Sequence, residues 1–316
     1  MIRESKEKID EVLRCAKNVI FGQDEMLESI LCAVICEGHL LIEGMPGLGK
    51  TLSISTMARL MDLSFKRIQF TPDLLPSDLL GTKIYSQRTE EFNTKFGPIF
   101  TQILLADEIN RSPAKVQSAL LEAMAEKQVT IGEETHKLSR PFVVLATQNP
   151  IDQEGTYPLP EAQLDRFMMK VSTGYPSEES EKSILDLKRD PLVDLNAILE
   201  NQTIQEIQRL VDSIYVDPKI KNFIVQIVQS TRPESKNFPS IYEGAILAGA
   251  SPRASIWLHK IGKFKAFMAG REFVAPEDIL NIVSSVLGHR VILTYEANID
   301  KINSKSLVLD IAKELI

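Results

Sequence analysis

The sequence contains few cysteines and few aromatic residues. Three cysteines, one tryptophan and an aromatic content of 6% occur in 316 residues. An odd and small number of cysteines argues against a disulfide framework and fits a reducing compartment. Cys32 and Cys36 lie four residues apart in an apolar helical stretch, and no further ligand residues lie nearby in the sequence. We therefore interpret them as buried thiols and not as a metal-binding pair.

Long apolar runs are absent as well. Residues 1–11 are charged throughout, no apolar core of a signal peptide follows them, and no apolar stretch is long enough to span a bilayer. We expect a cytoplasmic protein without membrane insertion, while peripheral attachment through a partner stays open. The formal net charge of −7 argues weakly against a broad nucleic-acid-binding surface, which usually needs a basic face, and leaves a local basic groove open.

The sequence also lacks the residue groupings of several kinds of catalysis. Its four histidines have no metal-ligand spacing, and no Ser/His/Asp or Cys/His grouping is found, so we interpret His39, His136, His259 and His289 as structural. The overall composition is ordinary for a globular protein, with 44% hydrophobic and 25% charged residues. The chain is long enough for two domains, or for one large domain with an appendage.

The order of the predicted elements indicates an α/β domain followed by a helical one. The apolar runs predict strands at 39–43, 65–70, 102–106, 142–146 and 168–171. Helices are predicted among them, at 4–21, 24–36, 50–61, from 113 onwards and at 160–165. This alternation predicts a parallel sheet covered on both faces. We place the α/β domain at residues 1–175 and a small all-helical domain at 180–316.

Two segments of the predicted α/β domain stand apart from this alternation. Residues 74–100 are punctuated by prolines and glycines, which predicts an irregular segment, although Lys83-Ile84-Tyr85 alternates in the manner of a strand. Residues 127–140 contain two short alternating runs on either side of Gly132-Glu133-Glu134, which predicts a β-hairpin.

The first chemical motif is a glycine-rich loop between a predicted strand and a predicted helix. Gly44-Met45-Pro46-Gly47-Leu48-Gly49-Lys50-Thr51 has the spacing of a P-loop, in which glycines let backbone N–H groups converge on phosphate oxygens. The positive end of the following helix faces the same anion. We expect Lys50 to reach the β- and γ-phosphates of ATP and the Thr51 hydroxyl to bind Mg²⁺. Leu52 completes the predicted nucleotide-binding residues of this segment.

The second motif is a pair of acids at the end of a predicted buried strand. Asp107 and Glu108 follow the apolar run Ile103-Leu104-Leu105-Ala106, at the sheet edge where ligands of open α/β sheets bind. We expect Asp107 to hold magnesium, through water, and Glu108 to orient and polarise the attacking water. An acidic pair alone can equally cap the next helix, but its combination with a P-loop favours a protein that hydrolyses ATP.

Three further residues are ambiguous by local sequence. Asn149 follows the next strand, where it can hold the attacking water or the γ-phosphate, or simply form a turn before Pro150. Arg166 and Arg253 follow or begin helices, where each can reach a nucleotide or lie in solvent. Local sequence leaves Asn149 undecided and favours the solvent position for the two arginines.

These residues resemble the AAA+ ATPases and, within them, the MoxR family, over nearly the whole chain. The stretches that carry the resemblance are 107–111 with 113–124, then 146–150, 160–167 and 249–254. The resemblance implies that Asn149 is the sensor 1 residue, Arg166 the arginine finger and Arg253 the sensor 2 residue. It also implies that 74–100 is the family's insert within helix 2, that 127–140 is its pre-sensor 1 hairpin, and that residues 19–22, with Gly22, contact adenine.

The function that the resemblance implies is a chaperone-like ATPase that remodels, matures or activates a client protein complex. It implies a homo-hexameric ring with ATP at the subunit interfaces, Arg166 reaching into the neighbouring site, and a partner with a von Willebrand factor A domain. Two alternatives stay open. One is a nucleotide-gated scaffold with little turnover, and the other is a metal-chelatase-like or DNA-remodelling motor. The acidic turn Gly132-Glu133-Glu134 argues against DNA, because it suits a phosphate backbone poorly.

Overall fold

The computed structural model describes residues 2–150, 156–186, 192 and 195–315 of the chain. They fall into two compact units. The first, the sheet unit, comprises residues 10–166 and 171–203, and the second, the helical unit, comprises 1–9, 167–170 and 204–316. The domain boundary near residues 174–180 stays a prediction.

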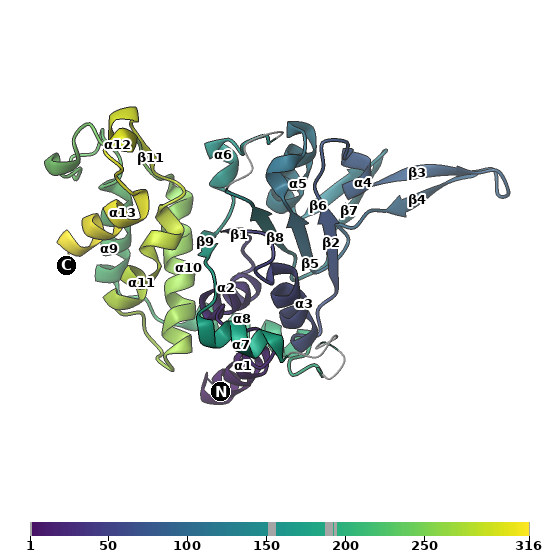
Figure 1. Ribbon diagram of the computed structural model, residues 1–316, viewed down its shortest axis with the longest axis horizontal. Coiled ribbons are helices and arrows are strands. Elements are labelled where there is room, and N and C mark those ends of the chain that lie inside the picture. The colour runs from purple at the N-terminus through teal and green to yellow at the C-terminus, as the bar shows by residue number, and fades with distance from the viewer. Residues whose placement is uncertain (1, 151–155, 187–191, 193–194, 316) are drawn as a thin grey trace. The chain divides into compact units, whose positions relative to one another are not determined.

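The sheet unit is built on a five-stranded sheet in the order β2-β5-β8-β1-β9 (Figure 1). The pairs β2–β5, β5–β8 and β8–β1 are parallel. In chain order the strands are β1 (Leu40–Gly44), β2 (Phe65–Gln69), β5 (Ile103–Asp107), β8 (Val143–Gln148) and β9 (Met169–Thr173). The three central strands each begin with a buried apolar run, as expected for strands covered on both faces, and carry polar residues at their carboxyl ends. The predicted parallel α/β sheet is therefore confirmed.

Helices follow or flank these strands. Before α8 (Asn201–Ser213), which is shared with the helical unit, those that include residues of the sheet unit are α1 (Ile2–Lys17), α2 (Asp24–Ile35), α3 (Lys50–Leu60), α4 (Pro76–Leu80), the 3₁₀ turn η1 (Ile109–Arg111), α5 (Ala114–Glu126), α6 (Glu161–Leu164) and α7 (Glu178–Leu185). Helix α2 contacts β1 and β8, while α3 contacts β5. Cys32 and Cys36 are buried, and their sulfur atoms lie 3.9 Å apart without a disulfide. Among the described residues, no group of three or more His, Cys, Asp or Glu side chains can hold a metal ion.

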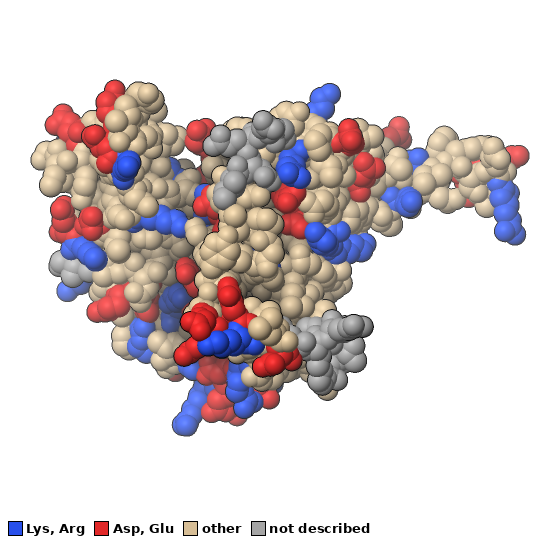
Figure 2. Space-filling model, viewed as in Figure 1, with Lys and Arg blue, Asp and Glu red and all other residues tan. Residues whose placement is uncertain are grey.

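The segment 74–100 is regular, in contrast to our prediction of an irregular one. After α4 it forms a β-hairpin of β3 (Gly81–Ser86) and β4 (Glu91–Phe96), paired from Gly81↔Phe96 to Ser86↔Glu91. The hairpin projects from the sheet unit, and Figure 2 shows its middle part largely uncharged with charged side chains at the tip. Tyr85 and Phe92 pack against each other across the hairpin although they are 50% and 68% exposed. The second strand alternates Phe92, Thr94 and Phe96 with polar residues, a pattern that our prediction of an irregular segment did not use.

A second hairpin joins the first one. It consists of β6 (Gln128–Ile131) and β7 (Glu134–Lys137). Lys83 Nζ of the first hairpin lies 3.0 Å from Glu134 Oε1 of the second. Phe96 lies edge-on to His136 with ring centroids 5.0 Å apart. An ion pair and a ring contact therefore connect the two hairpins.

The helical unit contains most of the C-terminal part of the chain. Its elements are α8 (Asn201–Ser213, shared with the sheet unit), α9 (Pro218–Gln229), η2 (Ser240–Tyr242), α10 (Pro252–Met268), α11 (Pro276–Leu287), α12 (Tyr295–Ile299) and α13 (Ser304–Glu314). The predicted helical domain is confirmed. It also contains one short antiparallel strand pair that we did not predict, Ile246–Ala248 (β10) with Ile292–Leu293 (β11). Two- and three-residue strands are too short to leave a sequence pattern. In the part of the chain that the structure describes, no helix is both long and apolar enough to cross a membrane.

His39, the residue before β1, is a buried neutral histidine. Its Nδ1 accepts a hydrogen bond from the backbone N–H of Val144 on β8 at 3.0 Å, so Nε2 carries the proton and donates to the carbonyl of Met124 on α5 at 3.3 Å. The imidazole thus ties α5 to two central strands. Desolvation by burial lowers the pKa of His39 from 6.5 to about 4.

The His39 pKa predicts a loss of stability in mild acid. The unfolded chain binds a proton at His39 near pH 6.5 and the folded chain only near pH 4, so the stabilisation is complete above pH 6.5 and is lost as the pH falls toward 4. From about pH 7.5 to about pH 5.5 this histidine should lower the free energy of unfolding by about 1.4 kcal/mol. Urea unfolding of wild type and His39→Gln at both pH values measures the difference. Burial also lowers the pKa of His289, but both proteins contain this residue, so its contribution to the pH dependence cancels. Equal pH dependence of the two proteins would contradict the assignment.

Candidate functional site

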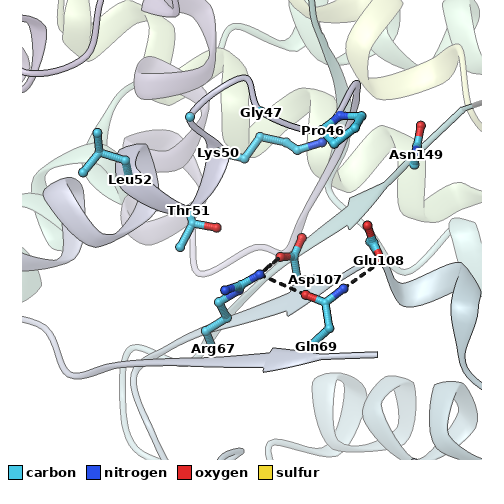
Figure 3. A pocket seen from close by; sticks show the side chains of 11 residues that line it. Pro46, Gly47, Lys50, Thr51, Leu52, Arg67, Gln69, Asp107, Glu108 and Asn149 are labelled. Atoms are coloured by element: carbon cyan, nitrogen blue, oxygen red, sulfur yellow. Dashed lines mark hydrogen bonds and ion pairs between the residues drawn. The ribbon is translucent and has the colours of Figure 1, made fainter. Parts of the chain in front are cut away.

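A cavity of about 450 Å³ lies at the carboxyl ends of the strands in the sheet unit (Figure 3). Thr51 comes from the start of α3, and Asp107, Glu108 and Asn149 come from the ends of β5 and β8 or the residues that follow them. The cavity is lined by Pro46, Gly47, Gly49, Lys50, Thr51, Leu52, Arg67, Gln69, Asp107, Glu108 and Asn149. Nine of these eleven are predicted site residues, and the structure adds Arg67 and Gln69.

The glycine-rich loop owes its form to backbone conformation at two positions and to space at a third. Gly47 and Gly49 have φ of +83° and +72°, and a Cβ at either position would meet no atom within 4 Å. Glycine is therefore needed there for the left-handed backbone. At Gly44, by contrast, a Cβ would lie 1.9 Å from Thr173 Oγ1 of β9. The loop can start where it does because Gly44 lets this neighbouring strand approach closely.

The Lys50 side chain folds into the loop. Its Nζ donates to the carbonyl of Gly44 at 2.6 Å and to that of Met45 at 3.1 Å. Desolvation lowers the pKa of Lys50, while the charges of Asp107 and Glu108 oppose the shift. The amine thus lies in the cavity, held by backbone oxygens that a phosphate oxygen can replace.

Both carboxylate oxygens of Asp107 accept hydrogen bonds. Oδ1 accepts from Thr147 Oγ1 at 2.5 Å, and Oδ2 accepts from Arg67 Nε at 3.1 Å and Nη2 at 2.7 Å. The same Thr147 hydroxyl oxygen accepts from the backbone N–H of Glu108 at 2.8 Å. Since β5 pairs with β8 up to Ala106↔Ala146, Asp107 and Thr147 are the next residues along these neighbouring strands, and Thr147 orders both acids.

Glu108 leaves the strand in a left-handed conformation, with φ of +55°. Such a conformation is uncommon for a residue other than glycine and is found preferentially at functional sites. Its Oε2 accepts from Gln69 Nε2 at 2.7 Å, and Arg111 Nη1 lies 3.4 Å away. The carboxylate is therefore held at the cavity by β2 on one side and by its own 3₁₀ turn on the other.

Sequence reasoning missed Arg67, Gln69 and the contact that Thr147 makes with the acids. Arg67 and Gln69 alternate on the edge strand β2, so both side chains lie on one face, and Gln69 pairs directly with Asp107. The only available signal was a polar residue at every second position of a strand. That signal gains meaning only when the neighbouring strand is known to end in two acids.

A second cavity of about 130 Å³ adjoins the first and is mostly apolar. It is lined by Val19, Ile20, Phe21, Gln23, Gly47, Leu48, Gly49, Leu52, Pro176 and Ile184. The two cavities share Gly47, Gly49 and Leu52, and the Leu52 side chain points away from Lys50 in Figure 3. Gly22 does not line this cavity. With φ of +71° and the Pro176 and Ser180 side chains within 3.3 Å of an added Cβ, it lets residues 19–23 pack against the segment that follows β9.

The two predicted arginines lie elsewhere. Arg166 does not line either of the two cavities, and its Nη1 donates to the carbonyl of Leu121 on α5 at 3.2 Å. Arg253 belongs to the helical unit, where its backbone N–H donates to the capping oxygen of Ser251 at the start of α10 at 3.2 Å. The roles predicted for Arg166 and Arg253 stay predictions.

Comparison with known proteins agrees with this geometry. Residues 39–169 match the ATPase family associated with various cellular activities (AAA), and residues 240–311 match the AAA lid domain. The chain is 43% identical to Chaperone MoxR1 of Mycobacterium tuberculosis, over 92% of this chain and 78% of that protein. It is 44% identical to YeaC of Bacillus subtilis, over 93% and 89% of the two chains.

A solved structure is similar over almost the entire length. The crystal structure of a proposed ATPase from Cytophaga hutchinsonii, at 2.00 Å resolution, has a TM-score of 0.91 and 45% identity, and the match covers 99% of this chain and 95% of that one. Protein MoxR of Paracoccus denitrificans is 28% identical over 87% of this chain and 86% of its own length. With the AAA fold, the lid domain and these relatives together, the chain belongs to the MoxR family of AAA+ ATPases.

Proposed function

We propose that this protein binds ATP together with Mg²⁺ and hydrolyses it to ADP and phosphate. One observation supports this most directly: a single cavity brings the glycine-rich loop, Lys50 and both strand-end acids together. Lys50 donates to the β- and γ-phosphates in exchange for the two carbonyls that it contacts in the structure. Glu108 orients the attacking water, and Asn149 holds that water or the γ-phosphate from the neighbouring strand.

The residues present fit a magnesium ion. Thr51 and Asp107 offer a hydroxyl and a carboxylate in one cavity, and Mg²⁺ prefers oxygen ligands. Both Asp107 oxygens already accept hydrogen bonds, so this acid would hold a water of the metal rather than the metal itself. When bound, magnesium would neutralise part of the negative charge on the phosphates.

The second cavity fits the base of the nucleotide. It adjoins the phosphate loop, and its lining combines apolar side chains such as Val19, Ile20 and Pro176 with the Gln23 amide. Flat heteroaromatic bases bind in mainly apolar sites with a few placed polar groups. Gln23 Nε2 donates to the Gly174 carbonyl at 3.1 Å, which fixes one wall of this cavity. Adenine in this cavity and phosphates in the larger one place a single nucleotide across Gly47 and Gly49.

The biological task that we propose is chaperone-like remodelling of a client protein complex by a hexameric ring. A relative that is 43% identical is named a chaperone, which supports this proposal. In the ring, Arg166 acts on the nucleotide of the neighbouring subunit, and Arg253 reports the γ-phosphate to the helical unit. A partner with a von Willebrand factor A domain is the protein we would search for first.

Binding of the nucleotide can be tested through Lys50. We expect Lys50→Ala to weaken the affinity for MgADP on the order of 10- to 100-fold, because a charge-assisted hydrogen bond to a phosphate is lost. Isothermal titration calorimetry measures the affinity. Lys115→Ala, which removes an exposed lysine from α5, is the matched control and should bind as wild type does. Absence of ADP binding by the wild-type protein, or equal binding by the Lys50 variant, would contradict the proposed function.

A further inference from the structure

Arg67 connects the two acids of the site. Its Nη2 donates both to Asp107 Oδ2 at 2.7 Å and to Gln69 Oε1 at 2.9 Å, and Gln69 Nε2 donates to Glu108 Oε2 at 2.7 Å (Figure 3). The guanidinium also fixes which way the Gln69 amide faces, since Oε1 accepts from Arg67 and only Nε2 is left for Glu108. One cation on an edge strand therefore positions Asp107 directly and Glu108 through Gln69.

The ion pair of Arg67 and Asp107 is asymmetric in its exposure. The Asp107 side chain is 14% exposed, whereas that of Arg67 is 48% exposed. An ion pair with one half-exposed partner contributes little to the stability of a fold, because solvent screens it. The same charge has a larger effect on a second cation that needs the same carboxylate, since the two compete for one acceptor group in a partly enclosed site.

Oδ2 of Asp107 accepts from two N–H groups of Arg67, whereas Oδ1 accepts only from Thr147 and keeps one lone pair. A divalent cation with its water shell therefore reaches Asp107 either at Oδ1, beside the guanidinium charge, or at Oδ2, by displacing the guanidinium. The exposed side of Arg67 lets the arginine withdraw into solvent, while Asp107 stays in place.

We propose that Arg67 is the resident counter-ion of Asp107 and opposes the divalent cation there. This inference rests on the proposed function and adds to it a positioning residue that sets how strongly metal and nucleotide binding are coupled. Without metal, Arg67 neutralises Asp107 and lowers the repulsion between the acid and the phosphates. With metal, that neutralisation is redundant. Arg67 therefore weakens the dependence of nucleotide binding on magnesium.

The coupling is measured with ADP, which is not hydrolysed. The dissociation constant of ADP is determined by calorimetry in EDTA and with saturating Mg²⁺. The coupling is the ratio of the constant in EDTA to the constant with Mg²⁺. In Arg67→Met, which keeps the aliphatic stem and removes the charge, we expect this ratio to rise about fivefold, mainly through weaker binding in EDTA. Arg67→Lys, which restores a positive charge, should return most of the way to the wild-type ratio.

A matched control separates this role from a general effect of charge. Lys66→Met removes a neighbouring charge from the opposite face of β2 and should leave the ratio unchanged. An unchanged or lowered ratio in Arg67→Met overturns the inference. A wild-type ratio of one, with magnesium giving no benefit, would instead refute the proposed Mg²⁺-nucleotide site itself.

Discussion

Glu108→Gln should lower the rate of ATP hydrolysis by a factor of about 10²–10⁴, the usual contribution of a general base. The amide has nearly the same size as the carboxylate and can still form a hydrogen bond with Gln69, so the cavity should keep its shape. It cannot accept a proton from water. Affinity for MgADP should therefore change little while the rate of phosphate release falls by that factor. A coupled phosphate assay and calorimetry on the same preparation give both quantities.

The control for this variant is Glu122→Gln, which makes the same change on the exposed face of α5. It should hydrolyse ATP as wild type does. If Glu108→Gln and wild type hydrolyse ATP equally slowly, the protein is a nucleotide-gated scaffold. The proposed binding of ATP would then stand, and the proposed hydrolysis would be wrong. If the variant is arrested with ATP bound, it can serve as bait for the client and for a partner with a von Willebrand factor A domain.

Arg166→Ala should lower the rate of hydrolysis by a factor of about 10³–10⁵, the range for an arginine finger. The only hydrogen bond described for its side chain within the chain is to the Leu121 carbonyl, so its removal should disturb the fold little. Arg166 does not line either of the two cavities described above, so the affinity of an isolated subunit for ADP should not change. Arg14→Ala, which removes a mostly exposed arginine from α1, is the matched control.

Mixing experiments test whether Arg166 acts on a neighbour. Arg166→Ala subunits keep a complete cavity, and Lys50→Ala subunits keep an intact arginine. Each is inactive alone under the proposed mechanism, but a mixture should regain part of the activity wherever a Lys50 variant presents Arg166 to an intact cavity. No regain, in a mixture shown by native mass spectrometry to form mixed oligomers, would mean that Arg166 does not act across an interface.

The site residues that sequence could predict are those fixed by local chemistry. Gly44, Gly49, Lys50 and Thr51 follow one another at set spacing, because a single loop has to surround a phosphate. Asp107 and Glu108 were predictable for a similar reason, since an apolar strand that ends in two acids places them at the sheet edge. The parallel sheet followed from alternating strands and helices.

What could not be predicted depends on which strands are neighbours. Arg67 and Gln69 look like solvent-facing residues until β2 is known to pair with β5, which brings them beside both acids. The requirement for glycine at position 44 likewise comes from Thr173, which is 129 residues away in the sequence. The hairpin of β3 and β4 was missed for another reason, since prolines and glycines at the ends of 74–100 indicated an irregular segment although β4 alternates Phe92, Thr94 and Phe96 with polar residues.

The link between the two hairpins has a mechanical consequence. Lys83 pairs with Glu134 and Phe96 packs against His136, so a swing of the arm formed by β3 and β4 would either break these contacts or move β6 and β7 with it. The arm is continuous through α4 with the chain that leaves β2, and the second hairpin is continuous with α5. A force on the arm's tip would therefore be transmitted to the sheet through the arm's own connections to β2 and β5 and also through the second hairpin to α5.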